Sequence, residues 1–461
     1  MARRSGSESG GLLNPVGGML RYPLVLLFLV GSACGEAASP QGGPARGIDG
    51  GESEPLGSPG IATGTTAEAA GASGDSSGEA SPDAPDPERF PRPERMRGIY
   101  LNAWASGSSV RTSALVEWAH ANDVNTFVLD LKDATGFISH RTSVPMAQEV
   151  GADGEIRIRD LPALLDRMEA GGIYPVARIV VFLDPLVARG RPDLAIQNAD
   201  GNVWVDGRGD VWVNPWSREV WDYHVELARE AAELGFPEVQ WDYVRFPDRP
   251  SSEMAGVRYP GADGGSKSDA IRGFLMHARD ALADLDLDLT ADVFGMATTV
   301  SDDVGIGQHW ESFIDVVDAA LPMVYPSHYA PGSFGLARPN AHPYEVVRRA
   351  VESGVARSRE VEGAGRLIPW LQAFTLGAPP YGAAEVLEQI RGARDAGVHE
   401  WILWNPGARY PDGIGGASGG ESGDPEAGEP GEAGEAGEAG EPDDAAGTAP
   451  RGEVQPAGSS R

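Results

Sequence analysis

Hydrophobic positions between residues 97 and 405 follow two alternating patterns. Short runs rich in Val, Ile, Leu and aromatic residues predict buried strands, and the longer stretches between them, apolar at every third or fourth position, predict amphipathic helices. The strands are expected at residues 97–104, 125–133, 174–184, 238–247, 289–297, 319–325, 367–374 and 400–405, and the helices at 113–122, 159–170, 217–234, 268–285, 310–317, 343–352 and 383–396.

Strands that alternate with helices predict a parallel sheet. Eight such strands are the number that closes a (β/α)₈ TIM barrel, so the expected fold class is α/β. An open, doubly wound sheet is the alternative. The sequence favours the barrel, because no glycine-rich dinucleotide-binding turn follows the first predicted strand.

Composition sets the bounds of the folded domain. Residues 35–95 and 413–461 consist mainly of Gly, Ser, Ala, Pro and Glu, and both are expected to lack a packed structure, because they have too few apolar side chains to offset the entropy of ordering. The first reads as a linker and the second as an acidic tail. Residues 96–412 remain for the barrel, a length typical of one large α/β domain.

Residues 1–34 have the layout of an export signal. A basic start at Arg21 precedes an apolar run at 24–30 that is too short to span a membrane, and small residues lead to Cys34, the only cysteine. This layout resembles a bacterial lipoprotein signal, although Gly31 stands where Leu is usual. The resemblance implies cleavage before Cys34 and its lipidation, and therefore an exported, membrane-anchored lipoprotein of the cell envelope or surface. Simple secretion is the alternative.

The charge narrows the choice of partners. The 461 residues include 68 Asp and Glu but only 37 Lys and Arg, which gives a net charge of −31. Nucleic-acid binding needs a basic surface, so a nucleic-acid partner is not expected. A single cysteine excludes an intrachain disulfide and a cysteine-based metal site.

The most informative stretch is EVQWDYVRFP at 238–247, a predicted strand that ends in Asp242 and Arg245 among aromatic residues. Burying a carboxylate is costly unless it is paired or used, and barrel enzymes carry their chemistry at this end of the strands. Asp242 is therefore a candidate catalytic group, which the positive charge of Arg245 would keep ionised. The alternative is a structural Asp–Arg ion pair that holds a loop.

Other predicted strand ends would bring further polar and aromatic groups to the same rim. Several carboxylates and aromatic rings in one cleft suit carbohydrate chemistry, in which two carboxyl groups act on the glycosidic bond. The groups are Asn102, Trp104, Asp130, Lys132, Asp133, Arg178, Asp184, Asp292, Tyr325, His328, Gln372, Trp404 and Asn405.

Structural roles compete with these functional ones. Asp130, Lys132 and Arg178 suit a strand-end ion-pair cluster, and Asp184, which precedes a proline, suits the start of a helix or turn. Trp104 and Trp404 could pack the top of the barrel, Asp292 could cap a turn, and His328 could be a loop histidine. No cofactor motif occurs and no ligand spacing demands a metal, although Asp clusters can bind Mg²⁺ or Ca²⁺.

The stretches RGIYLNAW, NTFVLDLKDATG, YPVARIVVFLDP, VWVNPW, EVQWDYVRFP, DVFGMAT, PMVYPSHY and WLQAF occur in this order between residues 97 and 410. In this the chain resembles a bacterial glycoside-hydrolase domain family long catalogued as a domain of unknown function. The resemblance implies a barrel distantly similar to α-amylase-like retaining glycosidases, whose nucleophilic Asp at the end of strand four corresponds to Asp242. Their acid/base lies on strand five or six, which points to Asp292, where the amylase-like pattern has Glu.

The expected function is hydrolysis of a polysaccharide at the bacterial cell surface. Asp242 would attack the anomeric carbon and Asp292 would act as acid and base. Asp130 and Lys132 would hold sugar hydroxyls, and the other rim residues would line the substrate site. The alternative is a non-catalytic carbohydrate-binding or cell-wall scaffold protein on the same barrel.

Overall fold

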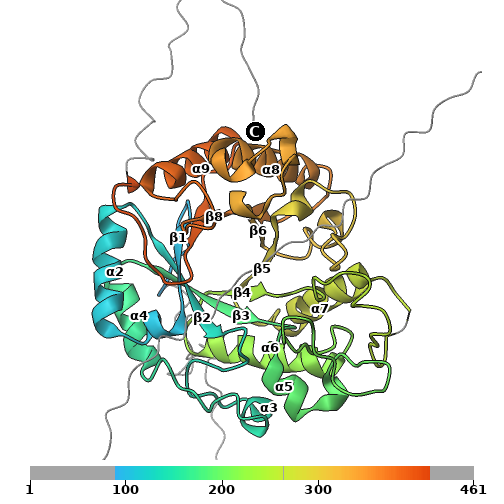
Figure 1. Cartoon of the computed structure of the whole chain (residues 1–461). Coiled ribbons are helices and arrows are strands. Elements are labelled where there is room, and N and C mark those ends of the chain that lie inside the picture. The colour runs from blue at the N-terminus through green and yellow to red at the C-terminus, as the bar shows by residue number, and fades with distance from the viewer. Residues whose placement is uncertain (1–88, 263, 416–461) are drawn as a thin grey trace, which may run out of the picture. The chain divides into compact units, whose positions relative to one another are not determined.

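The computed structural model describes residues 89–262 and 264–415, and within them one sheet of parallel strands closes into a barrel (Figure 1). β5 pairs with both β4 and β6, which closes the ring. β7 and β8 both pair with β6 and together fill a single position, so the nine strands make an eight-position barrel. The strands are β1 (Arg97–Leu101), β2 (Thr126–Lys132), β3 (Tyr174–Val180), β4 (Glu238–Asp242), β5 (Asp288–Phe294), β6 (Ala319–Met323), β7 (Arg366–Leu367), β8 (Trp370–Gln372) and β9 (Trp401–Trp404).

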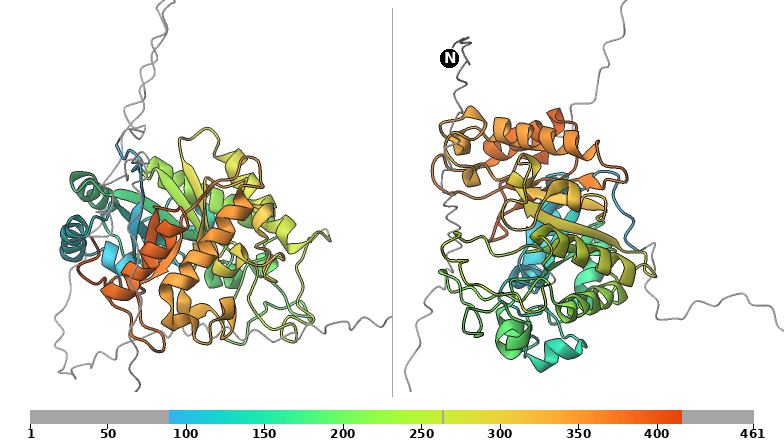
Figure 2. Two further views of the ribbon diagram at one scale, coloured as in Figure 1. Left: turned by 90° about the horizontal axis from the view of Figure 1, so that it is seen from above. Right: turned by 90° about the vertical axis from the view of Figure 1, so that its right-hand side faces the viewer.

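Helices surround this barrel in all three ribbon views (Figures 1 and 2). They are α1 (Ala103–Ser106), α2 (Ser109–Ala121), α3 (Pro145–Glu149), α4 (Leu161–Ala170), α5 (Pro185–Gly190), α6 (Arg218–Glu233), α7 (Lys267–Ala281), α8 (Pro343–Ser358) and α9 (Ala383–Asp395). The predicted (β/α)₈ barrel is confirmed.

The helices begin where the sequence supplies a cap. Ser217 accepts a hydrogen bond from the backbone at the start of α6, and Asp160 does the same for α4. At α7, Ser266 and Asp269 form a reciprocal capping box. Such caps satisfy amide groups that have no partner within the helix.

One predicted helix is not formed, and within the described residues the last strand is not followed by a helix. The helix expected over 310–317 is only a 3₁₀ turn at Trp310–Ser312, although Phe313, Ile314, Val316 and Val317 have helical spacing and are all buried. After β9 the described chain has no helix. Residues 405–415 instead run back along α2.

Three contacts fix that returning segment. Arg111 at the start of α2 donates to the carbonyl of Gly407, and the Trp118 and Tyr410 rings lie 5.4 Å apart. At the far end, Asn122 Oδ1 accepts the backbone N–H of Ile414 at 3.0 Å.

The packed chain extends beyond the predicted bounds of 96–412 on both sides. Phe90 and Ile414 are buried in the core, and Arg89 forms an ion pair with Asp166 of α4 at 2.5 Å. Phe90 and Ile414 therefore each hold in place a segment whose average composition is that of a linker. The predictions for residues 1–88 and 416–461, including Cys34, lie outside the described residues. No helix in the described ranges has both the length and the hydropathy that crossing a membrane requires.

Candidate active site

One guanidinium group lies at the centre of the polar groups inside the barrel. Arg178 of β3 donates two hydrogen bonds to Asp242 Oδ2, from Nε at 3.0 Å and from Nη2. Its Nη1 donates to Asp130 of β2, and its Nε lies 3.8 Å from Asp292 Oδ2 of β5. Arg178 therefore gathers the carboxyl groups of three different strands.

Asp242 is held at both oxygens. While Arg178 binds Oδ2, the backbone N–H of Tyr243 donates to Oδ1 at 2.5 Å. Tyr243 has φ of 50°, in the left-handed region that residues other than glycine rarely adopt. This turn directs the amide back toward the carboxylate, so both oxygens of Asp242 accept hydrogen bonds.

Asp292 is more deeply buried than Asp242 and accepts fewer hydrogen bonds. Its side chain is 2% exposed, and Oδ1 accepts a hydrogen bond from the indole N–H of Trp370 at 2.6 Å. Burial, and after it the nearby charge of Asp242, raise the pKa of Asp292 well above its usual range. The single positive charge of Arg178 cannot neutralise three carboxylates. The protonated form of Asp292 is therefore favoured over its ionised form.

Asp242 and Asp292 lie close to each other. Both line the same pocket. Their Oδ2 atoms lie 3.0 and 3.8 Å from the same nitrogen of Arg178, so the two oxygens cannot be farther apart than the sum of these distances. Paired carboxyl groups in glycosidases lie about 5–5.5 Å apart in retaining enzymes and about 6.5–9.5 Å apart in inverting ones. The upper limit that the two contacts with Arg178 set on the distance between Asp242 and Asp292 is compatible with the retaining spacing.

Asp130 lies behind Arg178, outside the pocket lining. It is buried, and it accepts hydrogen bonds from Arg178 and from the hydroxyl of Tyr100 on β1. Burial raises the pKa of Asp130 to about 6, although Arg178 acts against the shift. Asp130 therefore orients Arg178, and it does not reach the pocket in which a sugar would bind.

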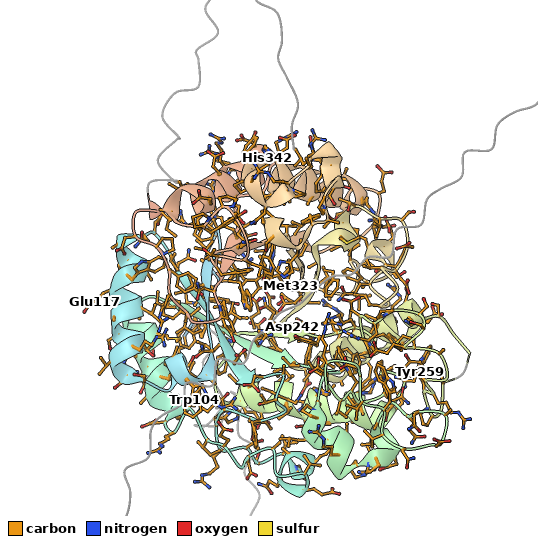
Figure 3. All side chains as sticks on the ribbon, viewed as in Figure 1. Trp104, Glu117, Asp242, Tyr259, Met323 and His342 are labelled. Atoms are coloured by element: carbon orange, nitrogen blue, oxygen red, sulfur yellow. The ribbon has the colours of Figure 1, made fainter. Side chains whose placement is uncertain are left out.

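The pocket has a volume of about 270 Å³ and an aromatic wall. The Tyr325 and Trp404 rings stack at 5.7 Å, and Phe374 meets Trp404 edge-on at 5.1 Å. Burial lowers the pKa of His328 to about 4, so this ring is neutral at pH 7. The lining consists of Arg178, Asp242, Tyr243, Arg245, Asp292, Phe294, Met323, Tyr325, His328, Trp370, Phe374, Thr375, Leu376, Trp404 and Pro406. Figure 3 shows Asp242 and Met323 near the centre of the barrel.

The expected ion pair between Asp242 and Arg245 is not formed. Asp242 instead forms its ion pair with Arg178. Arg245 donates to the carbonyl of Phe246 at 3.1 Å. Its guanidinium carbon lies 5.0, 4.7 and 4.8 Å from the ring centres of Trp212, Tyr243 and Phe294. The turn at Tyr243 redirects the chain, so that Arg245 reaches the pocket wall and not the Asp242 carboxylate.

Lys132 does not reach the pocket. It forms a buried ion pair with Asp184 at 2.9 Å and donates to the carbonyl of Val180 at 2.6 Å. The register of β2 shifts between Asp130 and Lys132, so the strict alternation that would place both side chains on one face is lost. Asp184 also caps α5, as its position before a proline predicts.

Three predicted site residues hold loops at the rim. Asn102 caps α1 and donates to the carbonyl of Pro406 at 2.9 Å. Gln372 accepts from the amide of Ser327 at 3.0 Å, and Asn405 donates to the carbonyl of Ala373 at 2.6 Å. None of the three lines the pocket, so their contacts support its wall.

Trp104 and Asp133 lie outside the pocket as well. The Trp104 side chain on α1 is 64% exposed, and its ring lies 5.6 Å from the guanidinium of Arg157, which Asp133 and Glu155 hold in place. Figure 3 shows Trp104 toward the periphery, away from Asp242.

Several residues of this site are absent from the sequence-based prediction. Tyr100, Tyr243 and Trp370 bind the central carboxyl groups, and Phe294, Met323, Phe374, Thr375, Leu376 and Pro406 complete the lining. Tyr100 and Trp370 lie within predicted strands, so the alternation of side chains along each strand could have placed them on the inward face. Within the described ranges, no three His, Cys, Asp or Glu side chains gather as a metal site would require.

A pair of carboxyl groups in the pocket of a (β/α)₈ barrel is an arrangement that glycoside hydrolases use. The chain belongs to the family described as "Putative glycosyl hydrolase domain", which it matches over residues 98–410. No curated protein matches the sequence.

Solved structures with similar folds include a hypothetical protein from Ruminiclostridium thermocellum, 30% identical over 41% of this chain and 96% of its own, with a TM-score of 0.38. The PgaB (BpsB) glycoside hydrolase domain from Bordetella bronchiseptica is 15% identical over 68% of this chain and 95% of its own, with a TM-score of 0.49. An exo-β-N-acetylglucosaminidase from Vibrio harveyi is 14% identical over 68% of this chain and 51% of its own, with a TM-score of 0.45.

Proposed function

We propose that this protein hydrolyses glycosidic bonds of a polysaccharide, with Asp242 as the nucleophile and Asp292 as the acid/base. The observation that carries the proposal is the shared contact of both carboxyl groups with Arg178 in one aromatic pocket. The two environments differ as the two roles require, since Asp242 accepts three hydrogen bonds and Asp292 is buried with a raised pKa.

In the first step, Asp242 Oδ attacks the anomeric carbon while Asp292 gives its proton to the leaving glycosidic oxygen. The bond to the departing sugar breaks, and a glycosyl ester of Asp242 forms. In the second step, ionised Asp292 takes a proton from water, whose oxygen attacks the same carbon and frees Asp242. Burial makes Asp292 a proton donor near neutral pH, and the neighbouring ester, which carries no charge, removes one cause of its raised pKa.

A polymeric substrate is supported by the exposed ring of Trp104. Aromatic rings can stack on sugar rings, and the guanidinium of Arg157 lies over the Trp104 ring, 5.6 Å from its centre. Asn102, which caps the helix that carries Trp104, donates to Pro406 of the pocket lining. The proposal assigns Trp104 as a second stacking surface for a sugar chain that leaves the pocket on the Pro406 side.

The alternative function is sugar binding without catalysis. It is favoured by the depth of Asp292, whose side chain is almost fully buried and hydrogen-bonded to Trp370. In that case the three carboxyl groups and Arg178 would only hold the barrel together.

An activity screen separates the two functions. The purified full chain is incubated with bacterial and plant polysaccharides, and the release of reducing ends is measured. The proposal expects release from at least one polymer and none with Asp242→Asn, which should bind the same polymer as tightly as the wild type. Binding without release, equal in both proteins, would support the non-catalytic function.

The proposal places the enzyme at the cell surface, held by a lipid on Cys34. It is supported by the resemblance of residues 19–34 to a lipoprotein signal. The wild-type chain expressed in a bacterium should partition into detergent, and Cys34→Ala should release it into the aqueous phase. Equal partitioning of the two proteins would remove the anchor from the proposal.

A further inference from the structure

Arg245 is a buried cation that forms no ion pair within the described part of the chain. The residue is 8% exposed and lines the pocket beside Asp242. It makes no salt bridge with any residue in 89–262 or 264–415, and its protein hydrogen bond goes to the neutral carbonyl of Phe246. The carboxyl groups of Asp248 and Asp242 act on it only through space.

Other buried or half-buried cations of the domain have carboxylate partners. Arg178 binds Asp242 and Asp130, Lys132 binds Asp184, and Arg157 binds Asp133. An unpaired charge in such a place is strongly unfavourable, because it loses hydration and gains no counter-charge. The exception therefore requires a reason specific to Arg245.

Three aromatic rings hold the guanidinium in place. The centres of Trp212, Tyr243 and Phe294 lie between 4.7 and 5.0 Å from it. Cation–π attraction offsets part of the cost of burial, but it does not use the N–H donors of the group. The net effect of burial is to lower the pKa of Arg245, which agrees with incomplete compensation by its surroundings. The rings thus fix a cation whose donors remain for a ligand in the pocket.

We propose that Arg245 binds an anionic substituent of the sugar, and that the substrate is an acidic polysaccharide built from uronic acids. This inference rests on the proposed function and names its substrate class. A guanidinium presents parallel donors that match the two oxygens of a planar carboxylate. Because Arg245 lines the same pocket as Asp242, the carboxylate belongs to the sugar ring that is cleaved or to the ring bonded to it.

Affinity electrophoresis tests the inference without catalysis. The full chain with Asp242→Asn is run through gels that contain polygalacturonate, alginate or hyaluronan, which carry carboxylates, κ-carrageenan, which carries sulfate esters, or the neutral polymers laminarin and soluble starch. We expect at least one of the carboxylate polymers to retard the protein. Adding Arg245→Gln should weaken that binding by about 100-fold, as expected for loss of one partner of a buried charge pair.

Three variants control this experiment. Arg208→Gln removes an exposed cation that acts on Arg245 through space but does not line the pocket, and it should bind the polymer as before. Arg245→Lys keeps the positive charge but loses the paired donors of the guanidinium, so its affinity for the polymer should lie between those of Arg245 and Arg245→Gln. Arg245→Met removes a buried charge that has no carboxylate partner, and this gain offsets the loss of the ring contacts and of the hydrogen bond to Phe246, so the melting temperature should change little. A large drop in its melting temperature would make Arg245 a structural residue and overturn the inference.

The remaining outcomes distinguish this inference from the proposed function. Retardation by neutral polymers only, by carrageenan only, or by none, or equal retardation with and without Arg245, overturns the uronic-acid inference. Hydrolysis of a neutral polymer that depends on Asp242 but not on Arg245 would leave the hydrolase standing and remove the acidic substrate. Binding of a uronate polymer through Arg245, with no release of reducing ends by the wild type, would keep the inference and remove the hydrolase.

Discussion

The indole N–H of Trp370 donates to Oδ1 of Asp292 at 2.6 Å, and this hydrogen bond joins β8 to β5 past the intervening β6. It acts against burial, because it stabilises the ionised carboxylate and so lowers the pKa that burial raises. The pKa of the proposed acid is therefore set by opposing contributions, and a single substitution removes the one from Trp370.

Trp370→Phe removes that donor and keeps an aromatic ring in place. We expect the pKa of Asp292 to rise further, so the high-pH limb of the kcat/KM profile should move up by about one pH unit, equivalent to ~1.4 kcal/mol. A pH profile on an activated aryl glycoside and on a polymer would measure it. An unmoved limb would mean that another group limits the rate at high pH.

Asp292→Asn removes the proposed proton donor. Substrates with poor leaving groups should lose about 10²–10⁴-fold in rate, because they need protonation, and activated aryl glycosides should lose far less in the glycosylation step. Comparing the two substrate types with the same variant measures this selectivity. If both are unaffected, the acid lies elsewhere, and Asp133 and His328 are the next groups to replace.

Arg178→Gln leaves the carboxyl groups of Asp242 and Asp130 buried without their cation. We expect the free energy of unfolding at pH 7 to fall by about 3–5 kcal/mol. The loss should shrink toward pH 4, where the carboxyl groups can take up protons. Denaturant unfolding at both pH values would show it, and a loss independent of pH would contradict the electrostatic explanation.

Glu238→Gln tests the opposite end of the barrel. Glu238 is fully buried at the start of β4, and burial, with the charge of Asp288, raises its pKa from 4.5 to about 7. A carboxyl group with a raised folded-state pKa contributes stability that is complete below pH 4.5 and is lost as the pH rises through about 7. The Gln variant should therefore lose less stability than the wild type between pH 5 and 8, with a difference of about 1–3 kcal/mol.

Unfolding curves at several pH values would measure that difference. Glu230 is the matched control, because its hydrogen bonds to His140, Thr142 and Ser143 lower its pKa to about 2. Glu230→Gln should cost stability at neutral pH, and this cost should disappear only as the pH falls toward 2. Parallel pH curves for the wild type and Glu238→Gln would refute the first expectation.

Trp104→Ala should separate polymers from small substrates. If the exposed ring stacks on a sugar outside the pocket, kcat/KM on a polysaccharide should fall by about tenfold, whereas an aryl monosaccharide should be unaffected. Val110→Ala, another exposed apolar side chain nearby in sequence, is the control. Equal losses on both substrate types would assign Trp104 a structural role.

The order of the strands and the position of Asp242 and Asp292 at strand ends could be predicted from hydrophobic periodicity alone. The contact of Arg178 with Asp130 is one of the structural roles that the sequence suggests for these residues, and the two are register partners on β2 and β3. The contacts of Arg178 with Asp242 and Asp292 could not be predicted, because they depend on the order in which β3, β4 and β5 lie in the barrel and on the direction in which the Arg178 side chain points. Periodicity also fails at the register shift after Asp130, which takes Lys132 out of the pocket. The positive φ of Tyr243, which separates Arg245 from Asp242, has no signal in a tyrosine.

Arg92 bridges Glu400, which precedes β9, and Asp288, which begins β5, at 2.7 and 3.6 Å. Asn122, which binds the backbone of Gly413 and Ile414, lies just before β2. Both ends of the described chain therefore leave from the side where the strands begin, whereas the carboxyl groups open toward the side where they end. The points at which the described chain begins and ends therefore lie away from the mouth of the pocket, and a polymer bound at that mouth meets neither of them.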